Sequence, residues 1–182
     1  MSANDCAGFT HRLATTADIP ALTVLMTSAI GELQRGFLSE AQIAASRKLM
    51  GLDSQLVADG TYFVIEDADG RIAGCGGWSR RATLYGGDHS PGRDAAVLEP
   101  AVDAARVRAM YTSPDFARRG VGRLILSLCE AAARAEGFRS LELAGTLSGQ
   151  PLYEACGYGV IEPFTDDRGG EPVPLLRMGK DI

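Results

Sequence analysis

Several features that would mark particular protein classes are scarce in this chain. Its 182 residues include only two histidines and four cysteines, and no C-x-x-C pair occurs among Cys6, Cys75, Cys129 and Cys156. These are too few suitably spaced ligands for a zinc site, so we expect no metal and free thiols. No stretch approaches the roughly 20 consecutive apolar residues of a membrane helix. We therefore expect no membrane partner.

Basic charge is also in deficit. Lys and Arg number 18 against 23 Asp and Glu, which gives a net charge of −5. A dedicated nucleic-acid binder normally carries a basic excess, so we expect no nucleic-acid partner. The first residues, MSANDCAGFT, hold an acid where a secretion signal needs basic charge, which predicts a cytoplasmic protein. Only Lys48 and Lys180 are lysines, so the clustering of arginine is the informative signal.

Residue periodicity predicts an α/β chain that forms a single domain over residues 1–182. Capping-box patterns at Thr15 and Ser39 predict two helices, the first of them ending at Gly31. Residues 61–78 are typical of a β-hairpin around Asp69-Gly70, and three glycines in its second strand indicate a bulge or a close backbone approach. The polar segment 79–103 is a long loop, of a kind that is usually functional or mobile.

The second half of the chain begins with a strand–helix–strand unit. A strand over 105–112, a helix from 121 to Gly137 and a strand over 140–143 form a βαβ unit, so the sheet is at least partly parallel. The remaining expected elements are a short helix over 151–156 and strands over 158–163 and 173–178.

The most informative segment joins the strand 105–112 to the following helix and has the sequence TSPDFARRGVGR. Its glycines let successive backbone N–H groups face one concavity, and the helix N-terminus adds its positive dipole end. With Arg118, Arg119 and Arg123, the segment predicts a site for an anion the size of pyrophosphate. A solvated arginine-rich helix start is the alternative. Ile125 stands where a dinucleotide fingerprint needs its third glycine, and no P-loop motif occurs.

Two motifs in this order resemble those of the GNAT N-acetyltransferase superfamily. The family's strand and its Gln/Arg-x-x-Gly-x-Gly/Ala loop are matched by MYTSP at 110–114 and ARRGVG at 117–122. Its closing signature, Tyr-Glu-x-x-Gly-Phe, is matched by YEACGY at 153–158. The helices and hairpin before them also fit the family order. The resemblance implies a mixed, centrally split sheet of six to seven strands with helices on both faces, split between the strands 105–112 and 139–144.

The resemblance also implies acetyl-CoA as co-substrate and direct transfer of its acetyl group to a primary amine of a small molecule or peptide. Tyr153 would protonate the departing thiolate, although a tyrosine that only packs on the sheet is the alternative. Ala117 departs from the family's Gln/Arg, and Thr146 stands where many relatives have asparagine. The expected cofactor-binding residues are Met110, Tyr111, Thr112, Arg118, Arg119, Gly120, Val121, Gly122, Arg123 and Thr146.

The general base and the acceptor site stay open at this stage. Residues 106–110 contain no carboxylate, so the base is Asp88 or His89 of the long loop, or a water relay. The residues expected to form the acceptor wall are Trp78, Arg80, Arg81 and Tyr85. A core position is the favoured alternative for Trp78, and a solvated surface pair is the alternative for the two arginines.

Two other functions also stay open. One is a CoA-binding regulatory or sensor module without turnover, and the other is an anion-binding interaction domain without CoA. A homodimer is one option for the assembly.

Overall fold

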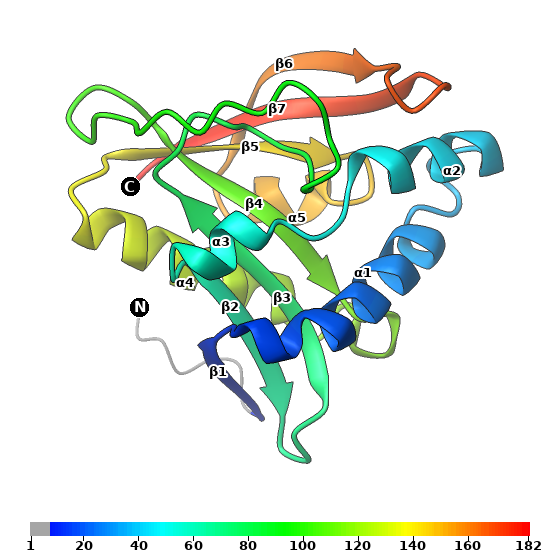
Figure 1. Ribbon diagram of the computed structural model, residues 1–182, viewed down its shortest axis with the longest axis horizontal. Coiled ribbons are helices and arrows are strands. Elements are labelled where there is room, and N and C mark those ends of the chain that lie inside the picture. Colours follow the sequence, from blue (N-terminus) through cyan, green and yellow to red (C-terminus); the bar gives the residue numbers. More distant parts are fainter. Residues whose placement is uncertain (1–7) are drawn as a thin grey trace.

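The structure is a computed structural model that describes residues 8–182. Cys6 and most of the N-terminal segment MSANDCAGFT lie outside the described residues. A seven-stranded mixed sheet carries helices on both faces, as expected (Figure 1). The strands are β1 (Phe9–Leu13), β2 (Tyr62–Asp67), β3 (Ile72–Ser79), β4 (Ala105–Thr112), β5 (Ser140–Thr146), β6 (Gly159–Asp166) and β7 (Val173–Asp181). The helices are α1 (Ile19–Leu33), α2 (Glu40–Leu49), α3 (Ser54–Ala58), α4 (Val121–Ala135) and α5 (Gln150–Ala155), with 3₁₀ turns at Thr16–Asp18 and Pro114–Phe116.

The sheet is split at its centre, between β4 and β5. The strand order is β1-β2-β3-β4-β5-β7-β6, and β4 and β5 form its parallel pair. They pair only at Ala105 with Leu141 and at Arg106 with Glu142, whereas β5 pairs with β7 from Ser140 to Thr146. Beyond Arg106 the two parallel strands diverge. This confirms the predicted split and its position.

Both capping boxes form, but the first helix is longer than predicted. Thr15 with Asp18, and Ser39 with Gln42, make the reciprocal side-chain and backbone hydrogen bonds of such boxes. Helix α1 continues through Gly31 to Leu33, because one glycine costs a helix interior only about 1 kcal/mol. A Cβ at Gly31 would lie 2.6 Å from the Arg47 guanidinium. The glycine therefore permits the close approach of α2 rather than ending α1.

The glycines of β3 hold helix α4 against the sheet beside the split. A Cβ at Gly74 would lie 2.5 Å from Val121 Cγ1, and one at Gly76 would lie 2.6 Å from Ile125 Cγ2. The predicted close approach is thus that of α4, whose apolar side enters the larger core on this face. The core on the opposite face is formed by α1 and α3 against β2 and β3. This packing places the N-terminus of α4 at the opening between β4 and β5.

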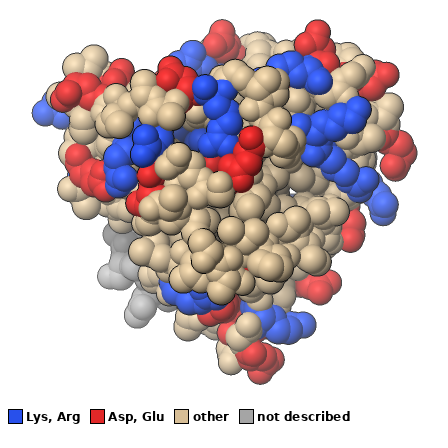
Figure 2. All heavy atoms as spheres, in the orientation of Figure 1, with Lys and Arg blue, Asp and Glu red and all other residues tan. Residues whose placement is uncertain are grey.

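The segment between β3 and β4 is tied to the body of the protein along its length. Arg81 forms an ion pair with Asp59, and Arg93 forms one with the buried Asp53, both at 2.7 Å. Charged side chains of both signs gather over this segment in the upper part of the molecule, whereas the face over α1 and α3 is largely uncharged (Figure 2). Among residues 8–182, no helix is long and apolar enough to cross a bilayer.

Candidate active site

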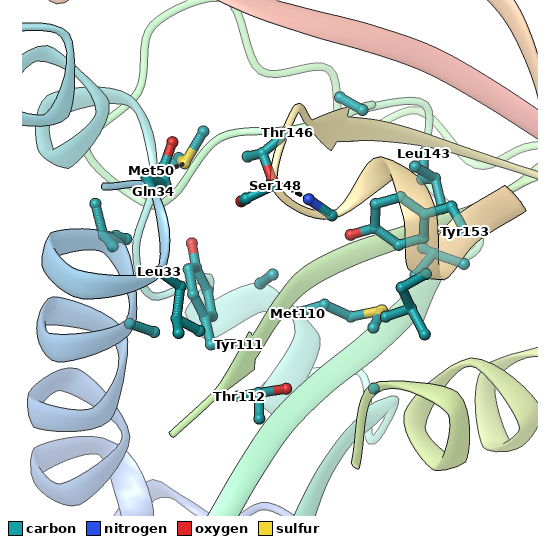
Figure 3. Close-up of a pocket in the computed structure, with 18 of the residues that line it drawn as sticks. Leu33, Gln34, Met50, Met110, Tyr111, Thr112, Leu143, Thr146, Ser148 and Tyr153 are labelled. Carbon is teal, nitrogen blue, oxygen red and sulfur yellow. Dashed lines mark hydrogen bonds between the residues drawn. The ribbon is translucent and has the colours of Figure 1, made fainter. Parts of the chain in front are cut away.

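A cavity of about 740 Å³ lies where β4 and β5 diverge (Figure 3). Its volume is in the range of pockets that bind small molecules. One end, here called the α4 end, is formed by Arg118, Gly120, Val121, Gly122 and Arg123. The other, here called the α1 end, is formed by Ala29, Ile30, Leu33, Gln34, Phe37, Met50, Gly51, Leu84, Tyr85, Gly86, Arg108 and Leu175. Residues of β4, β5 and α5 lie between the two ends.

The α4 end is built largely from backbone. Arg118 and Gly120 both adopt the left-handed conformation, with φ of 61° and 89°, so the chain turns sharply into the helix. The first N–H groups of an α-helix have no carbonyl partner within the helix, and they attract anions. Arg123 and Arg118 add two cations to the same wall. Gly122 has a further role, because a Cβ there would lie 2.5 Å from Leu152 of α5.

Arg119 does not join this wall, contrary to the sequence-based prediction. Its guanidinium lies 5.0 Å from the ring centre of Phe116 and 5.5 Å from that of Phe9. Both aromatic faces attract the guanidinium through cation–π interactions. The backbone N–H of Arg119 donates to the Phe116 carbonyl. Its side chain therefore packs the turn before α4, outside the cavity.

Strand β4 carries a bulge at the centre of the cavity. Ala109 has a φ of +49°, and the pairing with β3 skips from Arg108 to Tyr111. The buried Tyr62 hydroxyl donates a 2.7 Å hydrogen bond to the Ala109 carbonyl. Because a trans peptide points its C=O and N–H in opposite directions, this bond turns the Met110 N–H away from Tyr62. Ala109 and Met110 both line the cavity.

Tyr153 projects from α5 between the two ends of the cavity. Its hydroxyl points toward the centre, on the side of Met110 and Ser148 (Figure 3). Among residues 8–182 that hydroxyl has no hydrogen-bond partner, while the ring packs edge-on against Tyr158 at 6.3 Å. Burial raises the pKa of Tyr153 to about 12. The phenol therefore stays protonated at neutral pH and can donate its proton.

Thr146 ends β5 at the cavity wall. Its hydroxyl accepts a 3.2 Å hydrogen bond from the Gly149 N–H and lies 3.1 Å from the Ser148 hydroxyl. Gly149 in turn leaves room for the Tyr153 ring, since a Cβ there would lie 2.8 Å from it. Thr146 thus shapes the turn that brings Tyr153 into the cavity.

The α1 end was not predicted from the sequence, apart from Tyr85. Its members come from distant segments, and their only local signal is apolar periodicity, which any core residue shares. Arg108 forms a 2.7 Å ion pair with Asp53, and both side chains are buried, with 2% and 0% exposed. Desolvation lowers the pKa of Arg108, although Asp53 opposes that shift. Tyr111, between the two ends, accepts a 2.9 Å hydrogen bond from the Gly51 N–H.

Of the expected acceptor wall, only Tyr85 lines the cavity. Trp78 is buried against Phe138 because its large ring fills the main core. The guanidiniums of Arg80 and Arg81 turn away to ion-pair with Glu136 and Asp59. Tyr85 donates a 2.7 Å hydrogen bond to Asp166, which fixes its ring at the α1 end.

The two loop residues considered as general base lie outside the cavity lining. Asp88 accepts from the Ser54 N–H and forms a 3.1 Å ion pair with Arg93. His89 is exposed. Within residues 8–182, no carboxylate or histidine side chain lines the cavity, and no group of three or more His, Cys, Asp or Glu could hold a metal ion.

Comparison with known proteins agrees with the GNAT resemblance of the sequence motifs. Residues 58–160 match a family model described as an acetyltransferase (GNAT) domain. A GCN5-related N-acetyltransferase structure from Rhodopseudomonas palustris is similar, with a TM-score of 0.70, 18% identity and 97% of each chain covered. No curated protein matches the sequence significantly.

Two of the similar structures were solved with a CoA ligand. A phosphinothricin acetyltransferase from Sinorhizobium meliloti, in complex with AcCoA, has a TM-score of 0.64 and 19% identity, covering 96% of this chain and 89% of that one. A PaiA N-acetyltransferase from Thermoplasma acidophilum, in complex with coenzyme A, has a TM-score of 0.63 and 14% identity, covering 96% and 99%.

Proposed function

The chain belongs to the GNAT family of acetyltransferases, and on that premise we propose that it transfers the acetyl group of acetyl-CoA to a primary amine by direct attack. One observation carries the proposal. A single cavity joins the N-terminus of α4, which is suited to an anion, to a half-buried, protonated tyrosine whose hydroxyl has no hydrogen-bond partner among residues 8–182.

Acetyl-CoA would bind along the diverging edge of β4. The pyrophosphate lies on the N–H groups of the α4 end, with Arg118 and Arg123 as counter-charges. The amides of the pantetheine arm pair with Met110, Tyr111 and Thr112 as an added strand would. The divergence of β4 from β5 after Arg106 leaves this edge unpaired by β5. The CoA ligands of the two similar structures support the choice of cofactor.

The residues at the centre of the cavity carry out the transfer. The amine nitrogen bonds to the thioester carbon while the carbonyl electrons move to oxygen, and the Met110 N–H stabilises that oxyanion. When the intermediate collapses, the carbon–sulfur bond breaks and Tyr153 donates its proton to the thiolate. The nitrogen loses its extra proton to water, and Tyr153 regains a proton from solvent before the next turnover. The products are an N-acetyl amine and CoA with a free thiol.

The amine must lose a proton before it can attack. No carboxylate or imidazole lines the cavity within the described residues. We therefore propose that water, rather than Asp88 or His89, carries this proton to solvent. Two features favour the second candidate, a CoA-binding sensor without turnover. No general base lines the cavity within the described residues, and Ala117 replaces the Gln or Arg of the family motif.

Two measurements separate these functions. Calorimetry with acetyl-CoA tests for binding, and release of free thiol in the presence of a panel of amines tests for turnover. The proposed function predicts both, with one N-acetyl amine formed for each thiol released. Binding without amine-dependent thiol release would establish the sensor, and absence of binding would indicate an interaction domain without CoA. A cytoplasmic location and a homodimer stay predictions of the sequence.

A further inference from the structure

The α1 end of the cavity offers almost no charge to a ligand. Its wall is formed mainly by aliphatic and aromatic side chains, with Leu33, Met50 and Leu175 from three different segments. None of the residues that line the cavity within 8–182 is an aspartate or a glutamate. Helix α1, which supplies one side of this end, has Glu32 as its one charged residue, and that side chain is exposed. The end is therefore suited to apolar surface.

Among residues 8–182, Arg108 is the one cation at this end, and its charge is already balanced. Its guanidinium is 2.7 Å from the Asp53 carboxylate, and it also donates to the Gly86 carbonyl. Arg93 contacts the same carboxylate from the other side at 2.7 Å. A ligand carboxylate would have to compete with a buried ion pair that is already formed, and breaking such a pair is strongly unfavourable. Arg108 thus holds the wall together with its charge balanced by Asp53, and its Nε is a buried donor without a hydrogen-bond partner among the described residues.

The wall is also held in place. Tyr85 is hydrogen-bonded to Asp166, and Arg168 ion-pairs with that carboxylate while donating to the Pro91 carbonyl. The segment between β3 and β4 is thereby fastened to the end of β6, across the α1 end. A recess closed in this way fits a compact ligand better than an extended peptide.

Charge decides which amines can enter. An ammonium group taken from water into a wall without carboxylates is left unpaired, and burying an unpaired charge is costly. A monoamine escapes this cost, because its single nitrogen is neutral when it attacks. A polyamine, an aminosugar or a lysine-rich peptide would carry further ammonium groups into the wall. On the basis of the proposed acetyltransferase function, we propose that the acceptor is a small primary monoamine whose body is apolar and uncharged.

The most direct test compares two amines that differ by one charge. Hexylamine and 1,6-diaminohexane have the same chain length, but the second carries a further ammonium group. We expect kcat/KM to be at least about tenfold higher for hexylamine, which is the lower end of the discrimination that apolar pockets achieve. Equal use of the two amines, or a preference for the diamine, would overturn the inference and leave the acetyltransferase function intact.

A binding measurement keeps the inference separate from turnover. In the presence of CoA, N-acetylhexylamine should raise the melting temperature, whereas the N-acetylated diamine should do so only at much higher concentration. This comparison needs no catalysis. It therefore tests whether the α1 end prefers an uncharged apolar ligand even if no thiol is released from acetyl-CoA. Equal stabilisation by both compounds would contradict the proposal.

Substitutions at Leu33 show whether the α1 end sets the preference. Leu33→Asp places a carboxylate in the wall, and we expect the hexylamine preference to fall by about tenfold or more while the KM for acetyl-CoA is unchanged. Leu33→Asn removes the apolar surface without adding charge, so it should weaken hexylamine without favouring the diamine. Val24→Asp is the matched control, because Val24 lies on the outer side of the same helix and is 71% exposed. An unchanged preference in Leu33→Asp would place the acceptor elsewhere.

Discussion

The two ends of the cavity are built in different ways. The α4 end comes from one continuous stretch, 118–123, and is proposed to bind its ligand largely through backbone N–H groups that follow a left-handed turn at Gly120. The α1 end is assembled from segments as distant as Ala29 and Leu175, and side chains form most of its wall. Backbone chemistry can recognise a pyrophosphate whatever side chains surround it, whereas an acceptor is selected by side chains. The comparison explains why the cofactor could be inferred from a motif and the acceptor could not.

The largest expected effect is at Tyr153, where the two ends meet. Tyr153→Phe removes the proton donor and keeps the ring contact with Tyr158. General acids typically contribute roughly 10²–10⁴-fold, so kcat should fall by about a hundredfold or more if chemistry limits turnover. Calorimetry should show little change in acetyl-CoA binding. A lower melting temperature with nearly normal kcat would instead assign Tyr153 a packing role.

The next largest effect concerns the α4 end. Gly120→Val puts a branched side chain at a φ of 89°, where the pyrophosphate is expected to approach. We expect the Kd for acetyl-CoA to rise at least about tenfold, which corresponds to roughly 1.4 kcal/mol. Gly137→Val is the matched control, because it imposes a similar strain at φ 92° at the other end of the same helix. If both variants bind acetyl-CoA like the wild type, the anion site is elsewhere.

The third prediction is a pH profile that distinguishes a water relay from a protein base. Only the neutral amine attacks, so kcat/KM should rise about tenfold per pH unit up to the pKa of the amine, roughly 10.4 for an alkylammonium group like that of lysine. Burial raises the pKa of Tyr153 to about 12, so the phenol stays protonated over this range. We therefore expect no fall in kcat/KM below about pH 10. A kcat/KM that stops rising well below the pKa of the amine would instead implicate a protein base.

The smallest predicted effect tests the β4 bulge between the two ends. Tyr62→Phe removes the hydrogen bond to the Ala109 carbonyl and keeps the buried ring. With its carbonyl released, the Ala109–Met110 peptide loses its fixed orientation, and we expect kcat to fall several-fold, up to about tenfold, with KM for acetyl-CoA little changed. The unfolding free energy should fall by only about 1 kcal/mol. An unchanged kcat at reduced stability would limit Tyr62 to a structural role.

Local signals predicted most elements of the fold, and the anion site at the α4 end stays a prediction. The capping boxes, the Asp69-Gly70 turn and the glycines around Gly120 each act within a few residues, so their sequence is sufficient. Gly31 was misread because a glycine that admits Arg47 looks the same in sequence as one that ends a helix. The side chain of Arg119 lies outside the cavity because the fold brings together the two rings that it covers, and sequence does not show this.

The α1 end escaped prediction for a related reason. The pairing of Arg108 with Asp53, 55 positions apart in the chain, neutralises a cation that sequence alone would leave free to bind an anion. Arg80 and Arg81 likewise find Glu136 and Asp59 rather than an acceptor. Side-chain partners that are distant in sequence decide which charges a cavity offers, and no local pattern records them.

A crystal structure of the complex with CoA and N-acetylhexylamine tests the central claim most directly. We predict the pyrophosphate on the first turn of α4, the CoA sulfur within about 4 Å of the Tyr153 hydroxyl, and the hexyl chain against Leu33 and Met50. A pyrophosphate bound away from residues 118–123, or a sulfur that the Tyr153 hydroxyl faces away from, would contradict the account.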